Sequence, residues 1–149
     1  MTATATRTIP APALWLGLGG LLPFFGLSAG LWVTTGPLAL GLCTALVAYG
    51  AVILSFMGGV HWGAAMQGPG GPSWGRLVAS VLPALVAWPT VLMPVPGLGV
   101  LMAGFFGLLL YDLTLVKRGQ LVSWYSHLRL VLTAGVELSL GLAIAALVA

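Results

Sequence analysis

Apolar residues fall into five long runs along the chain, without the period-two alternation of a half-buried strand. The runs cover about residues 12–33, 38–66, 76–93, 98–116 and 128–148. A helix needs roughly 20 apolar residues to cross the hydrocarbon core of a bilayer. Because the strands of a membrane barrel alternate in polarity, the same runs exclude a β-barrel. The pattern therefore predicts an all-α integral membrane bundle of five transmembrane helices.

Short segments rich in glycine, proline or polar residues separate these runs and predict the connections. They are TTGP at 34–37, QGPGGPSWG at 67–75, PVPG at 94–97 and KRGQLVSWYSH at 117–127. We expect a turn at the first, a loop at the second, a tight reversal at the third and the longest polar connection at the fourth. Residues 1–149 then form a single membrane domain, in which the first ten residues are a short mobile arm.

The composition agrees with a membrane protein and excludes some partners. The chain of 149 residues is 60% hydrophobic and only 5% charged. Soluble domains carry about 25% charged residues, so this chain cannot cover a surface that faces water. The lipid bilayer is therefore the main expected partner. The few basic residues form no clustered face, which argues against nucleic-acid binding.

The basic residues indicate the orientation of the bundle. None of them falls in the first or third connection: they are Arg7, Arg76, Lys117, Arg118 and Arg129. Five antiparallel spans place all five on one side of the membrane. The positive-inside rule makes that side cytoplasmic. We therefore expect the N-terminus inside and the C-terminus outside.

Three ionisable residues lie within the predicted spans, where such residues are costly and are functional candidates. They are His61, Asp112 and Glu137, and all three fall in the inner half of the membrane. Arg76 and Arg129 enter at the same level. These five residues are our candidates for binding a ligand or relaying protons, because a histidine changes charge near neutral pH. The same five could instead form a closed, purely structural ion-pair network.

Aromatic residues and glycines complete the expected site. Trp62, Trp124 and Tyr125 would lie at the mouth of an inner-leaflet pocket. Small residues let helices approach closely in lipid. We therefore expect helix packing at five glycines, and a central position for the second helix with His61 facing the bundle. These glycines are Gly26, Gly30, Gly58, Gly59 and Gly63.

Catalytic and metal-binding patterns are weak. The two histidines, His61 and His127, lie on different elements, and no His-Glu-x-x-His motif exists. Cys43 is the single cysteine, so no Cys-x-x-Cys pair can form. Neither a catalytic residue nor a metal ligand is predicted, no cofactor is indicated, and an enzyme has no positive support.

Three stretches carry a resemblance to a known family. They are GLGGLLPF at 17–24, YGAVILSFMGGVHWG at 49–63 and WYSHLRLVLT at 124–133. With them the chain resembles a family of uncharacterised small membrane proteins that includes mitochondrial transmembrane protein 69. The resemblance implies a multi-pass protein with five helices. The absence of an Arg/Ser-rich transit segment favours a bacterial inner (cytoplasmic) membrane location.

Two functional hypotheses follow. In the first, the inner-leaflet polar cluster binds a small ligand, a lipid or a quinone headgroup, or relays protons. In the second, the protein is a structural or assembly subunit of a larger membrane complex, respiratory complexes included, and has no ligand of its own. The glycine faces would then serve for docking or self-association, and the charges would be internal struts.

Overall fold

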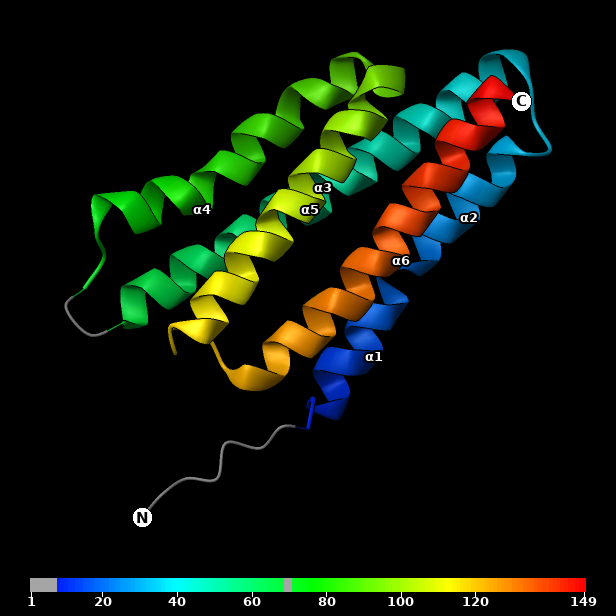
Figure 1. Cartoon of the computed structure of the whole chain (residues 1–149). Helices are drawn as coiled ribbons and strands as arrows, with labels where there is room; N and C mark the ends of the chain where they lie inside the picture. Colours follow the sequence, from blue (N-terminus) through cyan, green and yellow to red (C-terminus); the bar gives the residue numbers. More distant parts are fainter. Residues whose placement is uncertain (1–7, 69–70) are drawn as a thin grey trace.

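The computed structural model describes residues 8–68 and 71–149, and this part of the chain consists of helices joined by short connections, with no strand. Arg7 and most of the predicted N-terminal arm lie outside the described residues. Five helical segments are long and apolar enough to cross a membrane, so the prediction of five transmembrane helices is confirmed (Figure 1). The segments are Ala11–Leu31, Gly36–Gln67, Trp74–Leu92, Pro94–Lys117 and Ser123–Val148.

The first segment is broken into two short helices, α1 (Ala11–Gly19) and α2 (Leu22–Leu31). The break falls at Gly20 and Leu21, directly before Pro23. Proline has no N–H to donate to the carbonyl four residues earlier, so it ends one helix and suits the first turn of the next. The hydroxyl of Tyr49 donates a hydrogen bond to the carbonyl of Gly20 at 2.9 Å, which fixes the position of the break.

Proline also shapes the third segment, in which α4 (Trp74–Ala87) is followed by the 3₁₀ helix η1 (Trp88–Leu92). Pro89 cannot donate the hydrogen bond that would extend α4, and the tighter 3₁₀ turns continue the span instead. The hydroxyl of Thr90 donates to the carbonyl of Ala87 at 2.6 Å. This bond satisfies a carbonyl that the end of α4 leaves without its usual partner.

Two predicted connections are wrong in their bounds. The PVPG segment does not form the reversal, because α5 (Pro94–Lys117) begins with it. The first N–H groups of a helix have no partner within it, so proline is well tolerated there. The polar segment 117–127 is mostly helical, because α6 (Ser123–Val148) begins five residues earlier than predicted. The first turn of α6 contains several polar residues, and this polarity is why the sequence pattern predicts a loop there.

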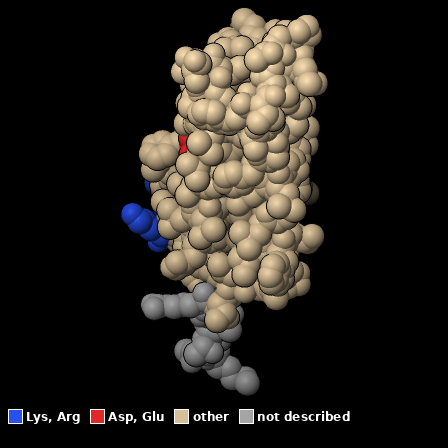
Figure 2. Space-filling view, turned by 90° about the vertical axis from the view of Figure 1, so that its right-hand side faces the viewer, with Lys and Arg blue, Asp and Glu red and all other residues tan. Residues whose placement is uncertain are grey.

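The bundle has two chemically different ends. At one end lie the C-termini of α3 (Gly36–Gln67) and α5 and the N-termini of α4 and α6 (Figure 1). We call it the basic end, because Arg76, Lys117 and Arg118 lie there. The opposite end, with η1 and the C-terminus of α6, carries no charged side chain among residues 8–68 and 71–149 and is called the neutral end. Figure 2 shows a face with few charged side chains, on which the Lys and Arg side chains lie toward one end.

Helix α3 is central, as predicted, and packs against α2, α4 and α5. One face of its second half is buried: Gly50, Leu54, Gly58, His61 and Ala65. A Cβ atom added at Gly58 would lie 2.3 Å from the carbonyl oxygen of Ser80 on α4. Glycine is therefore required at this position, because any side chain would push α3 and α4 apart.

The other glycines expected to mediate packing differ among themselves. A Cβ at Gly30 would meet the Leu42 side chain at 3.0 Å, so α2 and α3 approach closely there. A Cβ at Gly26, Gly59 or Gly63 would meet nothing within 4 Å. Within the described chain, these three glycines therefore mediate no close helix contact.

Candidate functional site

Three of the predicted polar residues meet in the interior of the bundle. Asp112 on α5 lies between His61 on α3 and Arg129 on α6. Its Oδ1 is 2.9 Å from His61 Nε2, and its Oδ2 accepts a hydrogen bond from Arg129 Nε. All three residues are buried, with at most 3% of each exposed. We call this cluster the triad; it links the consecutive helices α5 and α6 to α3, which lies earlier in the sequence.

The triad is a compensated buried charge. A charge removed from water is costly unless a partner and hydrogen bonds replace its hydration. Arg129 and Asp112 neutralise each other, and His61 adds a second favourable contact to Asp112 when Nε2 carries a proton. The His61 ring also packs edge-on against Tyr111, with 5.1 Å between ring centroids. Losing Asp112 or Arg129 would leave the other charge buried without its counter-ion.

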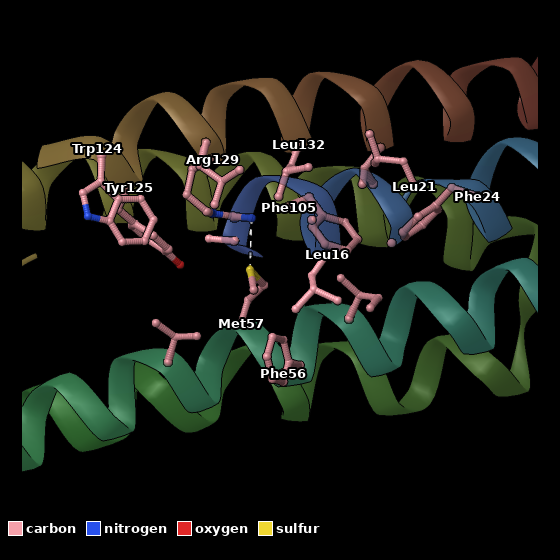
Figure 3. A pocket seen from close by; sticks show the side chains of 17 residues that line it. Leu16, Leu21, Phe24, Phe56, Met57, Phe105, Trp124, Tyr125, Arg129 and Leu132 are labelled. Atoms are coloured by element: carbon pink, nitrogen blue, oxygen red, sulfur yellow. Dashed lines mark hydrogen bonds between the residues drawn. The ribbon is translucent and has the colours of Figure 1, made fainter. Parts of the chain in front are cut away.

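Arg129 makes a second contact on the opposite side of its guanidinium group. Its Nη1 lies 3.1 Å from the Met57 sulfur on α3 (Figure 3). A thioether sulfur is only a weak acceptor, so this bond holds the guanidinium less firmly than the carboxylate does. Arg129 therefore has one side in the triad and another directed toward α3.

The other two candidates of the predicted cluster lie outside the triad. Arg76, at the start of α4, donates from Nη2 to the carbonyl of Ala64 at 3.1 Å. Glu137 is half-buried on α6 and forms no ion pair with any described residue. The ion pairs among residues 8–68 and 71–149 are those of the triad. The expected five-membered cluster is thus a cluster of three.

A cavity of about 350 Å³ adjoins the triad between α1, α2, α3 and α6. Its wall is almost wholly apolar, and Figure 3 shows Leu16, Phe24, Phe56 and Leu132 among the side chains that surround it. We call it the apolar cavity. Arg129, Tyr125 and Trp124 supply the polar part of its wall. His61 does not line it, so the triad contacts this space through Arg129.

The break in the first segment explains the cavity. Below the break α1 packs against α6, whereas α2 packs against both α3 and α6. The space between α1 and α3 is therefore left unfilled. Leu16 and Phe56, which line the cavity, are 79% and 65% exposed. The cavity consequently opens sideways, toward the surface that faces lipid.

Two polar atoms at this cavity are buried and have no hydrogen-bond partner among the described residues: Tyr125 Oη and Arg129 Nη2. Buried polar atoms are normally paired, and an exception calls for an explanation. Of the predicted pocket-mouth residues, Trp124 and Tyr125 line the cavity. Trp62 is 43% exposed and does not line it. The apolar lining was not predicted, because Leu16 and Phe56 look like ordinary lipid-facing residues.

Comparison with known proteins places the chain in a family. The family model described as "Protein of unknown function (DUF3429)" matches residues 9–145. The chain belongs to the DUF3429 family. This match confirms the resemblance noted in the sequence and covers all five membrane segments.

The curated relatives of this DUF3429 protein are animal membrane proteins. Transmembrane protein 69 of Xenopus tropicalis is 42% identical over 142 residues, which cover 91% of this chain and 54% of the frog protein. Transmembrane protein 69 of Mus musculus is 33% identical over 93 residues, 61% of this chain and 38% of the mouse protein. The chain thus spans about half the length of these relatives or less. No solved structure matches it.

Proposed function

We propose that this DUF3429 protein binds one membrane amphiphile, a lipid-like or quinone-like molecule, in the apolar cavity. One observation carries the proposal: two residues that line a largely apolar cavity, Tyr125 and Arg129, each hold a buried polar atom without a partner among the described residues. Ligand sites in proteins are typically apolar spaces with a few convergent polar groups. A hydroxyl and a guanidinium N–H are both donors, so they suit an acceptor oxygen of a carbonyl, ester or phosphate group.

The triad has a positioning role in this proposal. Arg129 is the longest polar side chain at the cavity, and a long side chain loses conformational entropy when it is fixed. Its salt bridge to Asp112 holds Nε, and the bond to Met57 limits the rotation of Nη1. The guanidinium of Arg129 is thereby held in one position before a ligand binds. A proton relay is less well supported, because the triad is closed and His61 does not reach the cavity.

The orientation and the location belong to the same proposal. The basic end carries Arg76, Lys117, Arg118 and, nearly two turns into α6, Arg129. By the positive-inside rule this end lies in the cytoplasm of a bacterial cell, with the protein in the inner membrane. The apolar cavity then opens into the inner leaflet. Fusion of a reporter enzyme to the C-terminus tests this orientation, because that end would then lie outside.

The experiment for ligand binding uses one cavity-filling variant and a matched control. Leu132→Trp enlarges a side chain of the cavity wall on α6, whereas Leu130→Trp makes the same change at a position that is 46% exposed and does not line the cavity. We expect native mass spectrometry in mild detergent to detect one bound amphiphile in the wild type and in Leu130→Trp. The amphiphile should be lost in Leu132→Trp.

Two outcomes would contradict the proposal. Retention of the amphiphile by a folded Leu132→Trp variant would place the ligand elsewhere. A wild-type protein that carries no amphiphile but copurifies with another membrane protein in fixed stoichiometry would favour the role of an assembly subunit. Tyr125→Phe, which removes the hydroxyl alone, should weaken binding without abolishing it.

A further inference from the structure

A second cavity, of about 700 Å³, lies at the basic end and differs from the first in its polarity. It is formed by the last turns of α3, the start of α4 and the connection between α5 and α6. Arg76, Arg118, Gln67 and Gln120 are among its lining residues. We call it the basic cavity. Val60 on α3 lines both cavities, so the two adjoin.

The basic cavity has a net positive charge that the protein cannot neutralise. The whole chain contains two acidic side chains, Asp112 and Glu137, and neither lines this cavity. Asp112 is engaged in the triad, and Glu137 lies further along α6. Two arginines therefore share one cavity without a carboxylate. Arginine presents a planar set of donors that matches the oxygens of a phosphate group.

The guanidinium of Arg76 is held in place rather than extended into solvent. Its Nη2 donates to the carbonyl of Ala64, one of the last carbonyls of α3. A Cβ atom added at Gly68 would lie 2.5 Å from Arg76 Nη1. The absence of a side chain at Gly68 thus makes room for this guanidinium. Such a fixed position is what distinguishes a binding group from a mobile basic anchor.

We propose that the bound amphiphile is an anionic phospholipid, with its phosphate group in the basic cavity and an acyl chain in the apolar cavity. The proposal rests on the proposed function and names the ligand class. Along α3 the path from Val60 to Ile53 is seven residues, or about 10 Å at 1.5 Å per residue. Both residues line the apolar cavity, so part of one acyl chain fits there. The sideways opening leaves the rest of the lipid in the bilayer.

This placement agrees with the depth of each group. Phosphate groups lie at the membrane surface, at the level of the connections, and acyl chains lie deeper. Arg76 and Arg118 flank the connections, whereas Arg129 and Tyr125 lie closer to the interior. The two deeper donors would therefore meet the ester carbonyls that follow the phosphate group in a phospholipid. An ordinary basic anchor would instead attract any anionic surface without a fixed stoichiometry.

The test compares two phospholipids with one headgroup difference. The detergent-purified protein is titrated with phosphatidylglycerol and, separately, with phosphatidylcholine, and native mass spectrometry counts the bound lipids. We expect saturation at one phosphatidylglycerol per chain and affinity for phosphatidylcholine lower by about tenfold or more, because each arginine near the headgroup favours an anionic lipid. Glycerol phosphate should not compete. If it does compete, the site is one for free phosphate compounds and the lipid proposal is wrong.

Variants of the basic cavity separate this inference from the proposed function. Arg76→Gln combined with Arg118→Gln should abolish the preference for phosphatidylglycerol and weaken phosphatidylcholine binding less than phosphatidylglycerol binding, because both lipids carry the phosphate group but only phosphatidylglycerol has a net negative charge. Gly68→Ala keeps every charge but displaces the Arg76 guanidinium, and should reduce the preference in part. Gly59→Ala on α3, which adds a methyl group where no atom lies within 4 Å and which lines neither cavity, is the matched control.

The results for these variants distinguish a failure of the headgroup site from a failure of the proposed function. If the double variant retains its preference for phosphatidylglycerol while Leu132→Trp loses both lipids, the headgroup site is wrong and the apolar cavity still binds an amphiphile. If Leu132→Trp retains both lipids, the proposed function itself fails. Equal binding of the two lipids by the wild-type protein would also overturn the assignment of an anionic headgroup.

Discussion

The two ends of the bundle are held together by different forces. Toward the basic end, the triad joins α3, α5 and α6 by ion pairs, and two cavities lie beside it. Toward the neutral end the same helices meet through fully buried apolar side chains such as Leu46, Leu98 and Leu140. Helices in lipid gain no hydrophobic free energy from contact with each other, so their association depends on close packing and polar bonds. Close packing of apolar side chains therefore stabilises the neutral end, whereas ion pairs stabilise the basic end, which contains the two cavities.

The largest effect is expected at the centre of the triad. Asp112→Asn keeps the shape of the side chain and removes its charge, which leaves Arg129 buried without a counter-ion. Breaking a buried ion pair from one side costs about 3–5 kcal/mol. Denaturant unfolding in detergent, followed by circular dichroism, should show this loss. Glu137→Gln is the control and should change stability by less than about 1 kcal/mol, since Glu137 has no ion pair among the described residues.

A variant with the whole triad replaced sharpens this expectation. Buried ion pairs can often be exchanged for apolar residues of similar volume at little cost. His61→Leu, Asp112→Leu and Arg129→Met together should therefore recover most of the stability that Asp112→Asn loses. The same triple variant should lose the bound amphiphile, because Arg129 Nη2 is gone. If Asp112→Asn alone is as stable as the wild type, the charges do not support the basic end.

An intermediate effect is expected where the neutral end packs most closely. A Cβ atom at Gly97 on α5 would lie 2.7 Å from the backbone oxygen of Thr90, whereas one at Gly99 would meet nothing within 4 Å. Gly97→Ala should therefore destabilise the protein by about 1–3 kcal/mol, as overpacking typically does. Gly99→Ala should be neutral or slightly stabilising, because alanine favours a helix. Equal unfolding free energies for the two variants would show that close packing does not hold this end.

The smallest loss of stability is expected for an interhelical hydrogen bond that lies between the two ends. The hydroxyl of Ser28 on α2 donates to the carbonyl of Ser139 on α6 at 2.6 Å. Interhelical hydrogen bonds in membranes contribute about 0.6 kcal/mol on average, so Ser28→Ala should lower stability by about that amount. Ser55→Ala removes a hydroxyl that bonds within its own helix, to Ala51, and should have less effect. A larger loss for Ser55→Ala would contradict this order in the unfolding measurement.

The sequence predicts depth well and rotation poorly. Positions along each span placed His61, Asp112 and Arg129 at one level, and they do meet. Glu137 belongs to the same predicted group, but it is half-buried on α6 and forms no ion pair with any described residue. Which side of a helix faces its neighbours depends on the packing of the whole bundle. Only for α3, with small residues such as Gly58 beside His61, did the sequence itself indicate the buried face.

The cavities could not be predicted for a related reason. The apolar cavity exists because α1 and α2, on the two sides of the break at Gly20, pack against different helices. No residue pattern in the sequence predicts this difference in packing. Leu16 and Phe56 are apolar whether they face lipid or a ligand. Pro23 was the available signal for the break. Proline indicates that a helix is interrupted, but it does not indicate the direction of the next segment.

The break has a mechanical consequence. It is anchored by the bond from Tyr49 to the carbonyl of Gly20, and beyond it α1 is a nine-residue helix that packs mainly on α6. A short helix that is fixed at one end and packed along one side can rotate about its fixed end. Such a swing of α1 would widen or narrow the sideways opening while α2, on the other side of the pivot, stays in place. The proposed amphiphile could then pass between the apolar cavity and the lipid leaflet without crossing water. The rate of this exchange would depend on how far α1 moves.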